Sequence, residues 1–366
     1  MISSDTLPSG WILKRLKEAC ILNPSKNEVS DLKEDIEVSF LPMAAISNDG
    51  QLLTKKSKRI NDVIKGYTYF REGDVLFAKI TPCMENGKRW LAKSLLNGIG
   101  FGSTEFHVLR PKSELISEWI YYFISQPSFR KKAKSSMTGT AGQKRVPKQH
   151  LENVLIPIPP IETQIGLVRI LQIVEKLTHK RKQANQIATK VIQALFFQLF
   201  GDPVRNEKSF EIKELKDVVA KNKHSLKRGP FGGSLKKEIF VNKGYKVYEQ
   251  QHAIKNNFDI GRYYITKEKY EEMKPFAVKT DDLIISCSGT IGKIAIVPQN
   301  AKEGIINQAL LKINVDKQKL LPIFMKYFLE TPQVQREMFG SARGSGIKNV
   351  ASMDVIRSTR IMVPPM

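Results

Sequence analysis

The sequence predicts an α/β (α+β) protein in which two similar mixed domains are separated by one long central helix. Three observations predict this arrangement: a long segment with recognisable helix start and stop residues, short segments that occur twice, and apolar runs separated by polar turns in both halves. We expect a first domain at 1–160, the helix at 161–200, a linker at 201–209 and a second domain at 210–366.

The central segment has a marked beginning and end. Pro159 and Pro160 suit the entry of a helix, and Gly201 followed by Pro203 is a common stop. At ~1.5 Å per residue the helix between them would be about 57 Å long. Helices of globular domains seldom exceed about 25 residues, so an ordinary core helix of one large domain is the less favoured alternative.

Apolar side chains recur along this segment at helical spacing, which gives a stripe on one face instead of an all-round coat. A lone helix of this length cannot bury such a stripe against itself and needs a partner helix or two flanking domains. The stripe includes Ile161, Ile165, Val168, Leu171, Val174, Leu177, Ala184, Ala188, Val191, Leu195 and Leu199, and basic residues interrupt it at 180–182.

The residues that lead into the helix occur again at the end of the chain. Ile156–Ile161 matches Ile361–Met366, so that Pro159 and Pro364 lie 205 residues apart. Further matches join Trp11–Glu18 with Phe210–Asp217, Gly73–Phe77 with Asp281–Ile285, Gly87-Lys88 with Gly292-Lys293, Tyr122–Pro127 with Tyr327–Pro332, and Gly142–Val146 with Gly346–Val350. A period this long indicates a duplicated domain of roughly 150 residues and excludes a solenoid of short repeats.

Each copy reads as strands followed by a helix. Segments rich in β-branched and aromatic residues predict strands, and the helix of the first copy, 117–125, is expected to be capped by Ser117 and to end before Pro127. The expected strands are 37–41, 75–80 and 106–109 in the first copy and 282–286, 294–297 and 309–313 in the second, where 323–329 is the matching helix.

Composition limits the kinds of partner. There are 59 Lys and Arg against 36 Asp and Glu, a net charge of +23, which favours a polyanion and above all nucleic acid. No apolar run is long enough to span a membrane, and the basic residues are not confined to one amphipathic segment. The N-terminus lacks a secretion signal, and the isolated Cys20, Cys83 and Cys287 build no disulfide or metal framework, so we expect a cytoplasmic protein.

Basic and glycine-bearing segments are candidates for contact with double-stranded DNA. Lys and Arg bind phosphates, glycine lets the backbone approach a groove, and Gln and Arg pair with base edges. For any one segment, a solvated loop is the competing interpretation. The candidates are Lys55, Lys56, Lys58, Arg59, Lys88, Arg89, Gly142, Gln143, Lys144 and Arg145 in the first copy and Lys227, Arg228, Ser288, Thr290, Lys293, Arg343 and Lys348 in the second.

The order of domain, long helix and domain resembles the specificity subunit of type I restriction-modification systems. In that family a proline pair after an apolar strand introduces each helix, with a Glu-x-Gln just inside, here Glu162 and Gln164. The resemblance implies two target-recognition domains that read the unequal halves of a bipartite DNA site, about one DNA turn apart. It also implies a second, distal helix, which this sequence lacks because it ends at Met366.

The same resemblance implies partners. The central helix would dock methyltransferase (modification) subunits through Ile165, Val168, Val174, Leu177, Val191 and Leu195. The chain itself would bind no cofactor, while S-adenosylmethionine would lie on the modification subunits and ATP and Mg on a restriction/translocase subunit. Without a distal helix, the stripe would lack its mate, which favours self-association, pairing with another chain, or a truncated or silent copy of the gene.

No catalytic motif stands out in the sequence. Pro159-Pro160 lacks the polar and aromatic neighbours of a methyltransferase motif, and Gly289–Lys293 lacks the spacing of a phosphate-binding loop. Triplets of the form Glu-x-Lys, as at 214–216, are common by chance in a lysine-rich chain. We therefore expect a DNA reader without catalytic activity, and the alternative is a stand-alone DNA-modifying enzyme with an unrecognised site.

Overall fold

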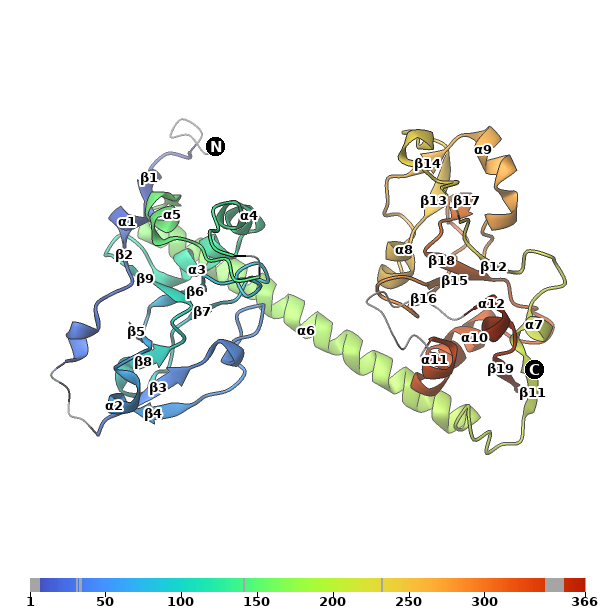
Figure 1. Cartoon of the computed structure of the whole chain (residues 1–366), viewed down its shortest axis with the longest axis horizontal. Helices are drawn as coiled ribbons and strands as arrows, with labels where there is room; N and C mark the ends of the chain where they lie inside the picture. Colours follow the sequence, from blue (N-terminus) through green and yellow to red (C-terminus); the bar gives the residue numbers. More distant parts are fainter. Residues whose placement is uncertain are drawn as a thin grey trace. The chain divides into compact units, whose positions relative to one another are not determined.

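The computed structural model describes residues 7–30, 32, 35–140, 142–231, 233–339 and 352–365. The chain divides into two compact units, Met1–Arg181 and Lys182–Met366, and the long helix α6 (Ile161–Phe200) contributes one part to each. The predicted fold class is confirmed, because two mixed α/β regions flank a central helix with the expected bounds (Figure 1).

The first unit contains two four-stranded sheets. One has the antiparallel order β2 (Cys20–Leu22), β9 (Phe106–Pro111), β6 (Val75–Ala78), β7 (Arg89–Leu91), and the other the order β4 (Ser57–Arg59), β3 (Glu37–Leu41), β8 (Ile99–Gly102), β5 (Thr68–Arg71), with β3 and β8 parallel. Helix α3 (Ser117–Ser125) packs on the first of these sheets (Figure 1). The remaining elements are β1 (Ile12–Arg15), α1 (Leu16–Ala19), η2 (Lys26–Val29), η3 (Met43–Ala45), α2 (Ile60–Val63), η4 (Leu96–Gly98), α4 (Pro127–Ser135), α5 (Lys148–Asn153) and β10 (Leu155–Ile158).

The second unit has the same plan. Its antiparallel sheet follows the order β12 (Leu226–Arg228), β18 (Leu310–Ile313), β15 (Leu283–Ser286), β16 (Ile294–Ile296), and a three-stranded sheet follows the order β14 (Tyr264–Ile265), β13 (Tyr245–Tyr248), β17 (Gly304–Ile306) with β13 and β17 parallel. The other elements are β11 (Glu211–Glu214), α7 (Leu215–Val218), η5 (Lys237–Ile239), α8 (Gln250–Lys255), α9 (Lys267–Glu272), η6 (Lys274–Phe276), α10 (Pro322–Leu329), α11 (Pro332–Phe339), α12 (Met353–Arg357) and β19 (Arg360–Val363).

The duplication extends to individual hydrogen bonds. In the first unit β1 pairs antiparallel with β10, with Leu13 opposite Pro157, and in the second β11 pairs with β19, with Ile212 opposite Met362. The residue after each first strand closes the pair in the same way, because Leu16 N donates to Val154 O and Leu215 N donates to Thr359 O, both at 2.9 Å. The matched segments of the sequence are therefore equivalent elements.

The helix α6 is anchored at its start and buried at only a few positions. Gln164 is fully buried, its Nε2 donates to Glu114 O and Pro159 O at 2.8 Å, and its Oε1 accepts a hydrogen bond from Ile116 N. Val168 packs within the first unit at 4% exposure and Phe196 within the core of the second at 5%. Most of the predicted stripe is exposed.

The predicted cap of α3 is wrong. Ile116 is the N-cap, and Ser117 is the first helical residue, so its hydroxyl donates to Gly73 O at 2.6 Å instead of receiving a backbone N–H of its own helix. The sequence predicted that the Ser117 hydroxyl caps its own helix, but in the structure it binds a backbone carbonyl from a distant segment. The predicted end is confirmed, since α3 stops at Ser125 and Pro127 begins α4.

Candidate nucleic-acid interface

The basic run of the first unit lies at a sheet edge. Lys55, Lys56, Lys58 and Arg59 are all exposed, and the last two belong to the edge strand β4. Lys58 Nζ lies 4.5 Å from the centre of the Phe40 ring, so this cation is held against the sheet. None of the ion pairs among the described residues involves Lys55 or Lys56, which leaves both charges available for a polyanion.

Lys55 and Lys56 also line a pocket of about 260 Å³. Aromatic side chains from three strands, Phe40, Phe70 and Trp90, form part of its wall. The arrangement combines an apolar recess with a cationic rim, the pair of features that proteins use to hold an unstacked base beside its phosphates.

The turn at Lys88 and Arg89 is more enclosed. Lys88 Nζ donates to Met43 O at 3.0 Å, and the Arg89 guanidinium lies 4.6 Å from the centre of the Tyr121 ring. Both residues are half-buried. Their charges hold the local fold as well as contribute to the positive potential of the unit.

Thr138 and Arg145 pair with each other, and the described residues between them, 139–140 and 142–144, form a loop. Thr81 fixes its tip, because the Thr81 hydroxyl donates to Gly142 O at 3.0 Å and accepts from Lys144 N at 3.1 Å. Gly142, Gln143 and Lys144 are exposed. The loop therefore presents an amide and a cation to solvent from a fixed backbone.

Arg145 has a different place from its neighbours. Its Nε and Nη2 both donate to the Glu105 carboxylate, with distances of 2.8 to 3.1 Å. This hydrogen bonding lowers the pKa of Glu105 below its ordinary value, although partial burial acts in the opposite direction. Arg145 thus anchors the loop to the body of the unit.

In the second unit, the candidate residues lie on β12 and on a glycine turn after β15. Lys227 and Arg228 are half-buried and lie over the rings of Phe276 and Phe231, each at 5.2 Å. The turn is held by Ser286, whose hydroxyl donates to Thr290 O at 2.6 Å and accepts from Lys293 N at 3.0 Å. As a result Thr290 and Lys293 are exposed, while Ser288 is half-buried.

Glycine is required within this turn. Gly289 and Gly292 have φ of +62° and +78°, and a Cβ on Gly292 would collide with the Gln335 side chain. Gln335 in turn donates to Gly292 O at 3.2 Å. Arg343 and Lys348, the remaining candidates of the second copy, lie outside the described residues.

The candidate docking residues of α6 differ in exposure. Ile165, Val174, Leu177, Val191 and Leu195 have between 37% and 61% of their surface exposed, whereas Val168 is 4% exposed. Val168 therefore belongs to the core of the first unit, and the other five offer apolar surface.

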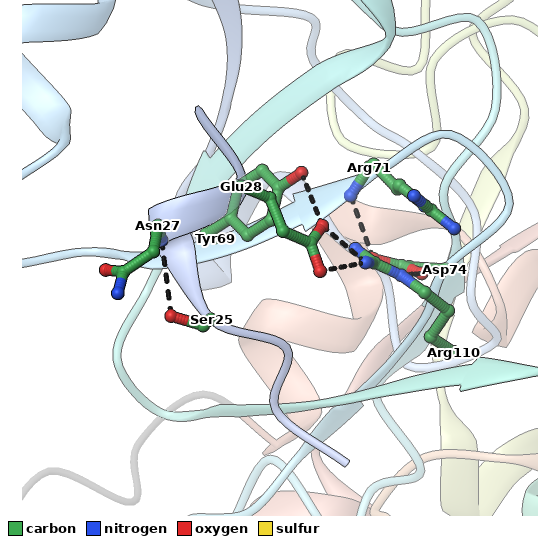
Figure 2. A network of polar contacts seen from close by, with 7 residues as sticks. All are labelled: Ser25, Asn27, Glu28, Tyr69, Arg71, Asp74 and Arg110. Atoms are coloured by element: carbon green, nitrogen blue, oxygen red, sulfur yellow. Dashed lines mark hydrogen bonds and ion pairs between the residues drawn. The ribbon is translucent and has the colours of Figure 1, made fainter. Parts of the chain in front are cut away.

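Sequence reasoning missed a buried ionic cluster in the first unit, shown in Figure 2. Arg110, at 3% exposure, donates through Nε and Nη2 to Asp74 at 2.8 Å and through Nη1 to Glu28 at 2.6 and 2.9 Å. The Tyr69 hydroxyl donates to the same Glu28 carboxylate at 3.2 Å. No short motif marks this cluster, because its members come from segments far apart in the sequence.

The cluster shifts the pKa of Glu28 down and the pKa of Arg110 up, so that the charged form of each is favoured. Burial alone would raise the pKa of Glu28, but the hydrogen bonds and charge of Arg110 outweigh it, and the pKa lies below the ordinary value. Burial alone would likewise lower the pKa of Arg110, and its two carboxylate partners raise it instead. The cluster thus joins β9, η2 and the turn before β6 through one buried cation and two carboxylates.

Within the part of the chain that the structure describes, no three His, Cys, Asp or Glu side chains are grouped to hold a metal ion. In the same residues, no helix is both long and apolar enough to cross a lipid bilayer.

Comparison with known proteins assigns the family. The model for the type I restriction modification DNA specificity domain matches residues 8–188 and 207–366. The chain therefore belongs to this family of DNA specificity domains.

Individual relatives agree with this assignment. The type I restriction enzyme EcoAI specificity subunit of Escherichia coli is 39% identical over 211 residues, which are 57% of this chain and 35% of that protein. The EcoEI specificity subunit of the same organism gives the same identity and coverage, so the match spans about a third of the length of each. The putative MjaX specificity subunit of Methanocaldococcus jannaschii is 22% identical over 98% of this chain and 84% of its own.

A solved structure shares the fold. The crystal structure of the type I restriction-modification S subunit from M. genitalium matches with a TM-score of 0.52 at 13% identity, over 96% of this chain and 84% of that chain.

Proposed function

We propose that the chain is the DNA sequence-specificity subunit of a type I restriction-modification complex and has no catalytic activity of its own. Each unit reads one half of a bipartite, asymmetric site in double-stranded DNA. The modification subunits supply S-adenosylmethionine chemistry, and a restriction/translocase subunit supplies ATP- and Mg-dependent cleavage. The complex acts in the cytoplasm.

The observation that carries this proposal is the duplication of one fold with different loops between equivalent strands. The two units share the register of their terminal strands and the parallel pair at the centre of their second sheets. Yet the segment between β6 and β7 spans residues 79–88, whereas the segment between β15 and β16 spans 287–293, and Arg89 at the start of β7 is replaced by Ile294 at the start of β16. Two domains of the same fold with different loops are suited to reading two half-sites of different sequence.

The exposed apolar residues of α6 support docking of the modification subunits. Val174, Leu177, Val191 and Leu195 each expose about half or more of their surface in this structure. Exposed apolar residues of this kind, here on both sides of the basic residues at 180–182, are typical of an interface.

The proposal is tested by selection of randomised duplexes with the chain in complex with its modification subunits. We expect two specified half-sites separated by unspecified bases. Enrichment of one continuous motif would contradict the bipartite reading. Methyl transfer by the isolated chain from a labelled donor would contradict the absence of catalysis.

Individual phosphate contacts are tested by the salt dependence of DNA affinity. Lys56→Gln and Lys144→Gln remove exposed cations that take part in no ion pair among the described residues. Each should weaken binding to all duplexes about equally and lower the slope of log affinity against log salt by about one. Lys134→Gln is the matched control, because Lys134 is neutralised by Glu85 at 2.6 Å and should change the slope less. Equal slopes for all three variants would remove Lys56 and Lys144 from the interface.

A further inference from the structure

The second unit contains a polar pocket of about 630 Å³, lined by residues of β18 and of the segments before β12, β15 and β17. Four lysines, Lys274, Lys279, Lys302 and Lys312, and two carboxylates, Asp282 and Glu303, line it. The pocket therefore has an excess of positive charge, and its size lies in the range that small ligands occupy.

Two buried polar atoms in its wall have no hydrogen-bond partner among the described residues. They are the hydroxyl of Ser225, a residue only 3% exposed, and Nδ1 of His224. Buried polar groups are rarely left unsatisfied, because the loss of water without a replacement partner costs roughly 1–3 kcal/mol. A ligand that accepts hydrogen bonds would satisfy the hydroxyl.

Lys312 adds a buried cation to the same wall. It is 6% exposed, and its Nζ donates to Ala277 O at 2.5 Å. No ion pair within the described part of the chain involves Lys312. The two carboxylates are already engaged: Asp282 accepts from Lys279 N and from Asn314 Nδ2, and Glu303 accepts from the Tyr270 hydroxyl.

The first copy has a region equivalent to this pocket, around Asp74. Asp74 and Asp282 are equivalent, since each accepts from the backbone N–H three residues before it, that of Arg71 or Lys279, at 2.8 Å. Leu109 is opposite Val75 on β6, and Ile313 is opposite Leu283 on β15. The next residues along these strands are Arg110 and Asn314, and each donates to the aspartate.

In the first copy a carboxylate occupies this place. The Glu28 side chain lies against Arg110 and accepts from the Tyr69 hydroxyl (Figure 2). Strand register makes Ala277 the counterpart of Tyr69, because Tyr69 is opposite Phe101 and Ala277 is opposite Ile305. Phe101 and Ile305 are themselves equivalent, since they pair with the parallel strands β3 and β13 at the same step.

The substitutions between the copies open the pocket and move the cation. Tyr69 is replaced by the smaller Ala277, and Arg110 by the smaller Asn314. Lys312 stands where the first copy has Val108, because Val108 is opposite Leu76 and Lys312 is opposite Ile284. The second copy thus keeps the buried aspartate and a buried cation but has a cavity beside them.

We propose that this pocket of the second unit binds a small oxyanion, held by Lys312, Lys279 and the Ser225 hydroxyl, in the way that the first copy holds the Glu28 carboxylate. The anion is a phosphate or carboxylate group, from either a free small molecule or the backbone of bound DNA. The site requires no partner subunit, because its residues lie inside one unit; only DNA as the source of the anion rests on the proposed function.

The test is titration calorimetry of the full chain with inorganic phosphate at constant ionic strength and about neutral pH. We expect saturable binding at one site per chain. Ser225→Ala removes a hydrogen-bond donor without a change of charge, and Lys279→Gln removes an exposed cation at the rim. Each should weaken phosphate binding by about tenfold. Lys255→Gln, an exposed lysine of the same unit that does not line the pocket, should leave it unchanged.

The source of the anion follows from a second measurement with duplex DNA. If backbone phosphate fills the pocket, duplex competes with inorganic phosphate and Ser225→Ala weakens DNA binding. If a free anion fills it, duplex does not compete and Ser225→Ala leaves DNA binding unchanged. Both results support the site. Absence of saturable phosphate binding, or equal phosphate affinity in Ser225→Ala, Lys279→Gln and Lys255→Gln, would overturn it.

Discussion

Replacement of Arg110 by methionine should destabilise the first unit strongly. Arg110 is 3% exposed and Asp74 is fully buried, so Arg110→Met leaves the Asp74 carboxylate with a backbone N–H from Arg71 as its remaining donor among the described residues. Loss of one partner of a buried ion pair costs about 3–5 kcal/mol. With a urea m-value of about 2 kcal/mol per molar, the unfolding midpoint of this unit should fall by roughly 2 M.

Tryptophan fluorescence measures this unit alone, because all three tryptophans of the chain, Trp11, Trp90 and Trp119, lie within it. Arg59→Met is the matched control: Arg59 pairs with Asp35 at 3.4 Å, and their side chains are 69% and 88% exposed. That exposed pair should contribute about 0–1 kcal/mol. Equal midpoints for the two variants would refute the argument that burial gives the Arg110 pair its importance.

Three further predictions concern the paired carboxylates of the first unit, the loop at 138–145 and the buried Phe196 of α6. The folded-state pKa of Glu28 and of Glu105 lies below the ordinary value. The stabilisation that these two carboxylates contribute is therefore fully present near neutral pH and is lost as pH falls through the folded pKa. The urea midpoint by fluorescence should be lower at about pH 4 than at about pH 7, and Glu105→Gln should reduce the difference. Glu105→Gln should also release the loop at 138–145, seen as faster amide exchange there than in the unmodified chain. Phe196→Ala should destabilise the second unit by about 3–5 kcal/mol, measured by circular dichroism, and Leu195→Ala, at 49% exposure, by much less.

The sequence was most informative where local chemistry decides the structure. The prolines before Ile161 and the glycine after Phe200 define α6 at both ends, because proline and glycine act through their own backbone restrictions. The repeat of Ile156–Ile161 at 361–366 predicted a duplicated domain, and the strands β10 and β19 have equivalent pairings in the two copies. Each helix signal lies within a few residues of the helix end that it defines, and the repeat is a match of sequence alone, so neither requires knowledge of distant contacts.

The sequence was least informative where a side chain meets a distant partner. Ser117 has the residue type of a helix cap, but the carbonyl of Gly73 binds its hydroxyl. Arg145 has the residue type of a DNA contact, and the structure pairs it with Glu105. The direct contacts of the other candidates with DNA remain predictions, because base readout depends on loop geometry in the complex and not on residue type.

Apart from its part of α6, each unit is enclosed by the same kind of two-stranded ribbon, β1 with β10 and β11 with β19. A protein segment whose two ends are hydrogen-bonded neighbours can be replaced by another such segment with little change to its surroundings. One strand of the ribbon leads into the domain and the other leads out of it, so the residues that distinguish one domain from the other lie between these two strands. Exchange of the entire insert, cut within these ribbons, is therefore the natural route by which such a chain could acquire a new target while its framework stays the same.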